Sequence, residues 1–203
     1  MTPEQIQSVG PQLSRYLEGF RPYMGQSRIQ RYLCIYARGQ LGPLERKSLE
    51  PIADAAGIPP RTLQEFLGEY EWNEDGVFGR VQRQAAQRSQ SAPETIGVVD
   101  GTDYAKKGSH TAGVQRQYCG HTGKIDNCVA TVGLSYTEPD FHALIDSEMY
   151  LPLEWHADRE RCRAAGIPET VVYRPHHEIA LSQVSRAKGN GVRLSWITAD
   201  ERF

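Results

Sequence analysis

The sequence is poor in cysteine and has no long apolar run, and both shortages limit the classes of protein to which it can belong. Its four cysteines have no C-x-x-C spacing, and none lies near a histidine at zinc-finger spacing, which argues against a structural zinc site. No apolar segment approaches the roughly 20 residues of a membrane span, and no signal peptide opens the chain. We therefore expect a cytoplasmic protein with reduced cysteines and no membrane partner.

The chain also lacks an excess of positive charge. Its formal net charge is −2, so no global basic field indicates nucleic acid. Between residues 91 and 153 there are only four Lys or Arg residues, against eight Asp or Glu, and those four lie in one glycine-punctuated stretch. They are Lys106, Lys107, Arg116 and Lys124. This composition argues against nonspecific coating of DNA but leaves room for a local patch that contacts phosphates.

Nucleophilic catalysis by serine or cysteine has no support either. No G-x-S-x-G motif occurs, and neither Cys119 nor Cys128 has a convincing base. The pair His176-His177 is equally weak as a metal site, because adjacent residues point to different sides of a helix or strand. We interpret these histidines as polar loop residues before a helix.

The first part of the chain has the periodicity of helices. Apolar residues recur at steps of three and four from residue 3 to residue 38, with a break at 19–25, and a polar helix is predicted at 81–90 after a break at 73–79. A linker at 89–93 places the domain boundary near residue 92. We therefore predict a helical domain at 1–92 and a second domain at 93–203.

Residues 46–72 have the pattern of a helix-turn-helix. Ala53 precedes Gly57 by four residues, which suits close helix packing followed by a turn with positive φ. The second helix would bury Leu63, Phe66 and Leu67 and expose Arg61 and Gln64 to double-stranded DNA. The alternative is a helical hairpin that touches no DNA, since such hairpins are common in bundles.

The second domain begins with a short apolar run, 96–100, which reads as a strand ending on Asp100. Further strands are predicted at 128–136 and 141–150, joined by a turn at 137–140, and helices at 154–165 and 178–188. A fourth strand, 194–200, delivers Asp200. If the first and last strands are neighbours, both carboxylates meet at one edge, as a site for Mg²⁺ or Mn²⁺ requires. The alternative is that each aspartate merely favours a turn.

Several motifs in this domain resemble those of a known family. The pieces with characteristic order and spacing are Val99-Asp100-Gly101-Thr102, Lys106-Lys107-Gly108, Arg116-Gln117-Tyr118-Cys119-Gly120, Gly123-Lys124, Asn127-Cys128, Leu151-Pro152, Glu154-Trp155, 163–168 and Ala199-Asp200. Together they resemble the bacterial insertion-sequence transposases with a DDE endonuclease domain.

The resemblance implies an α/β (α+β) architecture, in which a helical domain precedes a ribonuclease-H-like mixed sheet truncated after its fourth strand. It also implies divalent-metal cleavage and strand transfer on transposon ends and target DNA, by a homodimer on the DNA of the bacterial nucleoid. Asp100 and Asp200 would be catalytic metal ligands, and the four cations after Asp100 would bind DNA. The family's third acid, a glutamate, follows the second aspartate beyond residue 203, so we expect this chain alone to be inactive.

Two other carboxylates were weighed for the site. Asp103 could replace the second acid that the family carries beside its first aspartate, where this chain has Gly101, or it could have no role. Glu154 falls between the two aspartates, and we assign it a structural or DNA-facing role instead. Two alternative functions remain: a non-catalytic DNA-binding protein derived from a transposase, and, with little support beyond the paired acids, a stand-alone hydrolase.

Overall fold

The computed structural model describes residues 3–201 and 203, and it divides the chain into two compact units, 1–80 and 81–203. The division falls inside the helix α5 (Glu74–Ser89), which contributes to both units. The boundary predicted near residue 92 lies farther along, in the segment between α5 and the first strand.

The first unit is helical, as its periodicity predicts. Its elements are α1 (Pro3–Glu18), the 3₁₀ turn η1 (Arg21–Tyr23), α2 (Ser27–Leu41), α3 (Leu49–Ala55), α4 (Pro60–Gly68) and the start of α5. The predicted break between α1 and α2 is present, because Gly25 takes a positive φ of 68° just before α2 begins.

The core of the first unit forms where α2, α3 and α4 pack together. Ile52 and Ala53 of α3 are buried, and so are Leu63 and Phe66 of α4. The prediction that Leu67 belongs to this buried face is wrong, since its side chain is exposed. It directly follows Phe66 on the helix, so it points about 100° away from the packed face.

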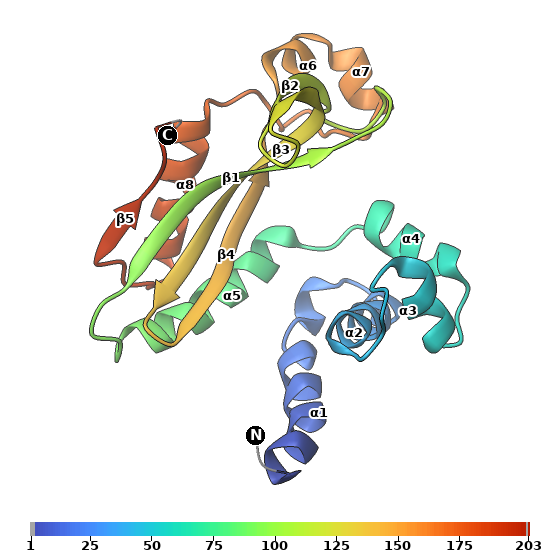
Figure 1. Cartoon of the computed structure of the whole chain (residues 1–203), viewed down its shortest axis with the longest axis vertical. Helices are drawn as coiled ribbons and strands as arrows, with labels where there is room; N and C mark the ends of the chain where they lie inside the picture. The colour runs from blue at the N-terminus through green and yellow to red at the C-terminus, as the bar shows by residue number, and fades with distance from the viewer. Residues whose placement is uncertain (1–2, 202) are drawn as a thin grey trace. The chain divides into compact units, whose positions relative to one another are not determined.

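The second unit is a five-stranded mixed sheet with helices (Figure 1). Its elements are β1 (Ile96–Ala105), β2 (Gln115–Cys119), β3 (Lys124–Glu138), β4 (Phe141–Met149), α6 (Leu153–Ala157), α7 (Arg159–Ala164), α8 (His176–Gly189) and β5 (Trp196–Thr198). The long strand β3 pairs with β1 along one edge. Along its other edge β3 pairs with both β2 and β4, each of which contacts a different stretch of β3. These pairings are antiparallel, whereas β5 is parallel to β1 on the outer side.

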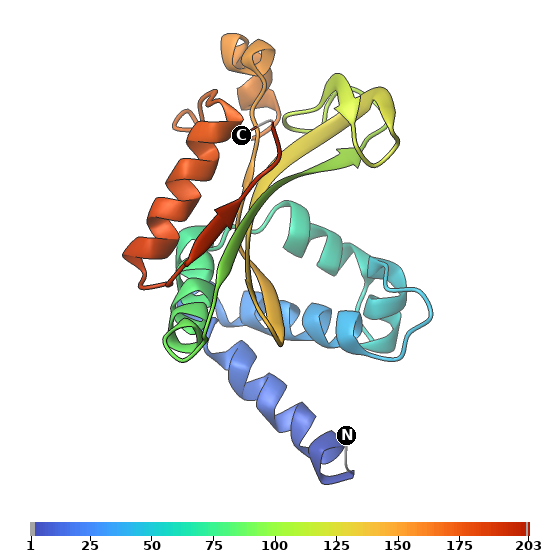
Figure 2. The same cartoon turned by 60° about the vertical axis from the view of Figure 1, so that its left-hand side comes forward.

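One face of the sheet is covered by helices and carries the main core. Side chains of α8 such as Ile179 and Ala187, and Ala85 of α5, pack against Val99, Leu134 and other strand residues. In Figures 1 and 2 α8 runs alongside the sheet from both directions of view. A second cluster, around Trp155, joins α6 and α7 to β3.

The order of elements is that of a ribonuclease-H-like fold: three antiparallel strands, a helix on one face, then a strand parallel to the first. The α/β class predicted from the sequence is therefore confirmed. Among the described residues, no helix is both long enough and apolar enough to cross a membrane.

Several details differ from the sequence prediction. The sheet has five strands instead of four, because β2 forms inside the stretch that we expected to be a loop. The helix predicted at 81–90 begins earlier, at Glu74, where the Asn73 side chain accepts a hydrogen bond from the Gly76 amide (2.8 Å). The helix predicted at 154–165 is divided at Asp158, whose carboxylate caps α7 by accepting from the Arg161 amide (2.9 Å).

Candidate metal centre and nucleic-acid interface

The strand that carries Asp100 and the strand that leads to Asp200 are neighbours, which is the condition on which the shared site depends. The last strand is shorter than the predicted 194–200, since β5 ends at Thr198, two residues before Asp200. Parallel pairing between β1 and β5 joins Ile96 to Trp196, Gly97 to Ile197 and Val98 to Thr198, a constant offset of 100 residues. Asp100 and Asp200 each lie two residues beyond the last of these pairs. The register therefore directs both aspartates to the same end of the β1–β5 pair.

A buried threonine fixes this register at the other end of the pair. The Thr95 hydroxyl donates to the carbonyl oxygen of Arg193 (2.8 Å). The Ser195 amide in turn donates to the carbonyl oxygen of Thr95 (2.9 Å) and to its hydroxyl oxygen (3.1 Å). Because Thr95 is fully buried, these hydrogen bonds are shielded from water and hold β5 beside β1.

Asp100 lies in the middle of β1, not at the strand end that the sequence predicts. The strand continues to Ala105 because β3 pairs with it along its whole length. Val99 is buried under α8, so alternation places Asp100 on the opposite face, where it is exposed. We call this second face the open face. The register partner of Asp100 on β3 is Gly133, which has no side chain to lie beside the carboxylate.

The other acids near this edge have different neighbours. Asp103 accepts a hydrogen bond from the Gly120 amide (2.8 Å), so it supports the turn after β2. Glu154 is exposed in the first turn of α6. Within residues 3–201 and 203 no group of three or more His, Cys, Asp or Glu side chains is close enough to hold a metal ion.

Two buried thiols lie beside Asp103 and take no part in an acid cluster. Burial and, after it, the neighbouring Cys119 together raise the pKa of the Cys128 thiol to about 11. A thiol with such a pKa stays protonated and unreactive at neutral pH.

The basic stretch after Asp100 is partly ordered by one asparagine. The Asn127 side chain donates to the carbonyl oxygens of Lys106 (3.1 Å) and Gly108 (2.5 Å), while the Lys106 amide donates to the carbonyl of Asn127 (2.8 Å). Gly108 has a φ of 86°, which a side chain would strain. The backbone of the loop is thus held to β3 and its side chains project from it.

Most cations of this stretch have no carboxylate partner among the described residues. Lys106, Lys107 and Arg116 are exposed and form no ion pair within 4.0 Å in that part of the chain. Lys124 is exposed as well, but its ammonium lies 3.8 Å from Asp126. Three of the four cations of this stretch therefore present a charge that no carboxylate of the described residues pairs with.

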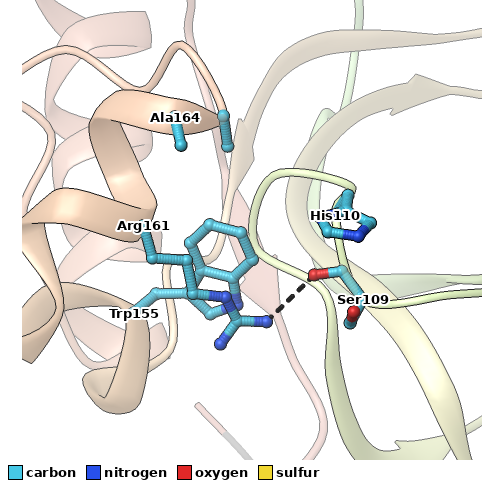
Figure 3. A pocket seen from close by; sticks show the side chains of 6 residues that line it. Ser109, His110, Trp155, Arg161 and Ala164 are labelled. Carbon is cyan, nitrogen blue, oxygen red and sulfur yellow. Dashed lines mark hydrogen bonds between the residues drawn. The ribbon is translucent and has the colours of Figure 1, made fainter.

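A pocket of about 280 Å³ opens beside this loop (Figure 3). The Arg161 guanidinium lies 3.8 Å from the centre of the Trp155 ring and donates to the carbonyl oxygen of Ser109 (3.1 Å). His110 lines the same pocket. Sequence reasoning missed Arg161, which forms no ion pair within 4.0 Å in the part of the chain that the structure describes and adds a fourth such cation around the loop.

The helix-turn-helix predicted at 46–72 is present as α3 and α4. Gly57 takes a φ of 65° in the turn, and the Ile58 amide donates to the carbonyl of Ala53 (3.0 Å). Arg61 and Gln64 are exposed on α4, as expected. The Arg61 guanidinium is engaged by Glu65 at 2.6 Å, one turn along the same helix.

Comparison with known proteins decides the family. Residues 19–203 match the family described as "DDE superfamily endonuclease". The chain belongs to this family. It is also similar to a protein of Microchaete diplosiphon described as "Probable transposase for insertion sequence element IS701", with 28% identity over 166 residues. The match covers 81% of this chain and 40% of that relative, so the chain spans less than half of the relative's length.

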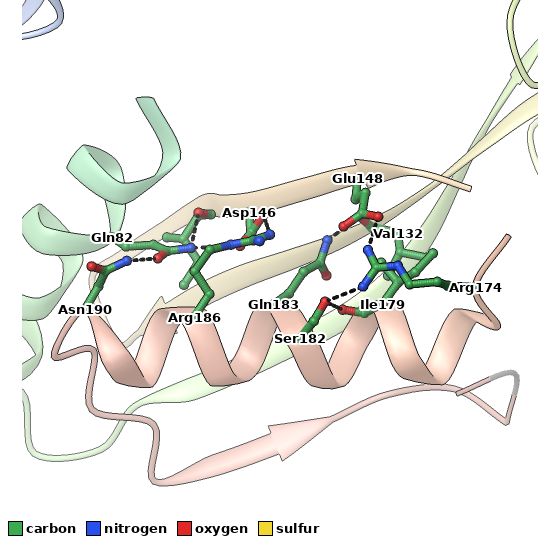
Figure 4. Close-up of polar contacts among 11 residues, drawn as sticks. Gln82, Val132, Asp146, Glu148, Arg174, Ile179, Ser182, Gln183, Arg186 and Asn190 are labelled. Atoms are coloured by element: carbon green, nitrogen blue, oxygen red, sulfur yellow. Dashed lines mark hydrogen bonds and ion pairs between the residues drawn. The ribbon is translucent and has the colours of Figure 1, made fainter. Parts of the chain in front are cut away.

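In this member of the DDE superfamily endonuclease family, a buried polar network joins α8 to the sheet (Figure 4). The Asp146 carboxylate of β4 is fully buried and accepts from Arg186 Nε (2.7 Å), Arg186 Nη2 (2.8 Å) and Gln82 Nε2 (2.8 Å). Glu148 is ion-paired with Arg174 just before α8. Because α8 leads directly to β5, this network helps to place Asp200.

Sequence reasoning also misjudged the histidine pair. His176 and His177 are the first two residues of α8 and do not lie in a loop before it. The His176 ring stacks on Tyr150, with 4.1 Å between ring centres. A ring held in this way packs the start of α8 against the end of β4.

Proposed function

We propose that this chain is the DNA-binding and acid-bearing portion of an insertion-sequence transposase, with Asp100 and Asp200 as ligands of a catalytic divalent metal. The observation that carries the proposal is the offset of 100 residues between β1 and β5, which directs two exposed aspartates, distant in sequence, to the same end of the β1–β5 pairing. The family assignment and the similarity to a relative described as a transposase support the same function.

The two aspartates fit Mg²⁺ or Mn²⁺. Mg²⁺ is commonly held by one or two carboxylates together with waters and substrate phosphates, so a site with two protein ligands is adequate for it. When bound between them, the metal would activate a nucleophilic oxygen and stabilise charge during phosphodiester cleavage. The β1–β5 pairing ends at Thr198, two residues before Asp200, and both aspartates are exposed, so a phosphate could reach them from solvent.

The remaining residues would bind and orient DNA. Lys106, Lys107, Arg116 and Lys124 would contact backbone phosphates of the bound DNA, because the two lysines follow the end of β1 and the other two cations lie on the β2–β3 hairpin beside it. Arg61 and Gln64 would contact the transposon ends from α4. A transposon has two ends, and we propose that a homodimer binds them on DNA of the nucleoid.

We propose further that residues 1–203 bind DNA and metal but do not cut. In-line displacement uses two metal ions, and two aspartates supply too few oxygen ligands to order both. The test combines this chain, Mn²⁺ and a labelled duplex carrying the terminal sequence of the element. Binding without nicking is expected. Nicking that disappears in Asp200→Asn would show that the chain supplies the whole ligand set, and would refute this part of the proposal.

The helix-turn-helix is tested on the same duplex by fluorescence anisotropy. If Arg61 contacts a base edge, Arg61→Ala removes that contact and should weaken binding by about 1–3 kcal/mol. Arg15→Ala, which removes a cation from α1, is the matched control and should change affinity little. Equal affinity of Arg61→Ala and the unchanged chain would make α3 and α4 a scaffold.

A second candidate is a non-catalytic DNA-binding protein, such as a repressor or a transpososome subunit. The absence of a three-acid cluster among the described residues favours it. The two candidates differ in their response to metal: the repressor should bind its duplex equally well with Mn²⁺ and with EDTA, whereas a metal site beside the bound phosphate should tighten binding in Mn²⁺.

A further inference from the structure

Three large side chains stand exposed on the strands that follow Asp100. Tyr104 of β1 is 52% exposed, Tyr118 of β2 is 58% exposed and Ile125 of β3 is 61% exposed. Single exposed apolar side chains are common, whereas several on neighbouring strands form a patch of the kind that marks a binding surface. Their exposure therefore needs an explanation.

Strand alternation places these side chains on the open face, with Asp100. Pairing with β3 joins Asp100 to Gly133 and Tyr104 to Val129, and β3 alternates without interruption between these two positions. On the other edge of β3, Tyr118 pairs with Ile125. Positions 125, 129 and 133 of β3 are separated by even numbers, so their register partners all lie on one face.

The charges on this face are complementary to a polyanion. Arg116 lies two residues before Tyr118 on β2, and Lys106 lies two residues after Tyr104. The carboxylates of Asp103 and Asp146 alternate onto the other face with buried residues, so Asp100 is the acid that the β1 strand presents here. Val129, the partner of Tyr104, belongs to the hydrophobic cluster of Trp155, over which Arg161 lies.

Exposed rings alternating with cations are the features by which proteins hold unpaired nucleotides. Each base stacks on a ring, and the cations follow the phosphates between the bases. A duplex offers its phosphates to such a surface but keeps its bases stacked inside, so the rings would gain little from fully paired DNA. The combination favours a strand whose bases are accessible.

We propose that the open face at Tyr104 and Tyr118 binds unpaired nucleotides of the DNA strand next to Asp100, with bases stacked on the two rings and phosphates held by Arg116 and Lys106. This proposal rests on the proposed function, because it concerns the same DNA. It adds that the DNA is opened where it meets the sheet. The two rings differ in position, so they hold different nucleotides of one strand.

The test compares two duplexes of identical paired sequence, one blunt and one with a four-nucleotide unpaired tail that contains 2-aminopurine. Binding is measured by anisotropy on the 203-residue chain, and stacking by quenching of 2-aminopurine fluorescence. The tailed duplex should bind more tightly and its fluorescence should fall on binding. Tyr118→Leu should weaken binding of the tailed duplex by about 5- to 150-fold, the range for loss of one stacked base, and leave the blunt duplex unaffected.

Two further variants separate stacking from other effects. Tyr118→Phe keeps the ring and should behave like the unchanged chain, whereas Tyr104→Leu should repeat the loss. Leu181→Ala alters an exposed apolar side chain of α8, away from the open face, and should change neither duplex. Because all these side chains are exposed, the variants should fold, which circular dichroism checks.

Equal binding of the two duplexes, or equal losses on both in the leucine variants, would overturn the inference and leave the proposed function standing. Failure of the chain to bind either duplex would overturn both.

Discussion

The buried pair of Asp146 and Arg186 provides the sharpest test of how this fold holds the strand that carries Asp200. The Asp146 side chain has no exposed surface and accepts three hydrogen bonds, two of them from Arg186. Arg186→Met removes the charge and both of its hydrogen bonds and leaves the carboxylate with only the Gln82 amide. Removing one member of a buried ion pair costs about 3–5 kcal/mol.

The structure favours the lower end of that range. The Arg186 side chain is 34% exposed, so water can enter beside the shortened side chain and solvate part of the carboxylate. We therefore expect Arg186→Met to lower the free energy of unfolding by about 3 kcal/mol. The double variant Asp146→Asn, Arg186→Met buries no charge, and it should recover about 1–3 kcal/mol of that loss.

Hydrogen exchange read by mass spectrometry is the suitable assay, because it reports on β4 and α8 separately from the first unit. In Arg186→Met, amides of both elements should exchange faster, by the factor that corresponds to the lost free energy. The exchange rates of the double variant should lie between those of the single variant and those of the unchanged chain. A double variant no more protected than Arg186→Met would refute the reasoning, since the cost would then not come from an unpaired buried charge.

Two further predictions concern local features. Gly57→Ala should destabilise the first unit by about 1–2 kcal/mol in urea titrations, because Gly57 has a φ of 65°, which strains an alanine. The new methyl group would meet no atom within 4 Å, so no packing contact would offset that strain. Gly10→Ala, inside α1, should instead stabilise the first unit by about 0.8–1 kcal/mol. Hydrogen bonds from Tyr136 and, to a smaller extent, Arg88 lower the pKa of Glu138 in the folded chain. The ionised carboxylate therefore stabilises the fold fully at pH values above its pKa in the unfolded chain. This stabilisation is lost as the pH falls through the lower pKa of the folded chain. Glu138→Gln should therefore flatten the acid limb of melting temperature against pH, and an unchanged slope would contradict this.

The sequence predicts the main elements of the sheet because their signals are local. The apolar runs near Val99 and Ile197 and the turn at Pro139-Asp140 can each be read within a few residues. The start of α5 could have been found too. Asn73 followed by acidic residues is a helix N-terminal signal, and it was outweighed by the glycines nearby.

Other features depend on partners that are distant in sequence. β1 runs past Asp100 because β3 pairs with it, and a run of Gly101-Thr102-Asp103 alone does not indicate a strand. Asp146 is buried in β4 only because Arg186 reaches it from 40 residues away. The candidate metal pair was predicted from the strand ends, whereas the hydrogen bonds of Thr95 that set its register were not visible in the pattern.

The central claim, that Asp100 and Asp200 share a divalent metal, is tested most directly by the melting temperature of the chain in Mn²⁺. Two carboxylates that share a site repel each other, so a bound ion should stabilise the second unit, by about 2.7 kcal/mol when Mn²⁺ exceeds its Kd 100-fold. Asp100→Asn and Asp200→Asn should each abolish the rise, and Asp140→Asn, in the exposed turn between β3 and β4, should retain it. A melting temperature indifferent to millimolar Mn²⁺, or a rise that survives in Asp100→Asn, would contradict the shared site.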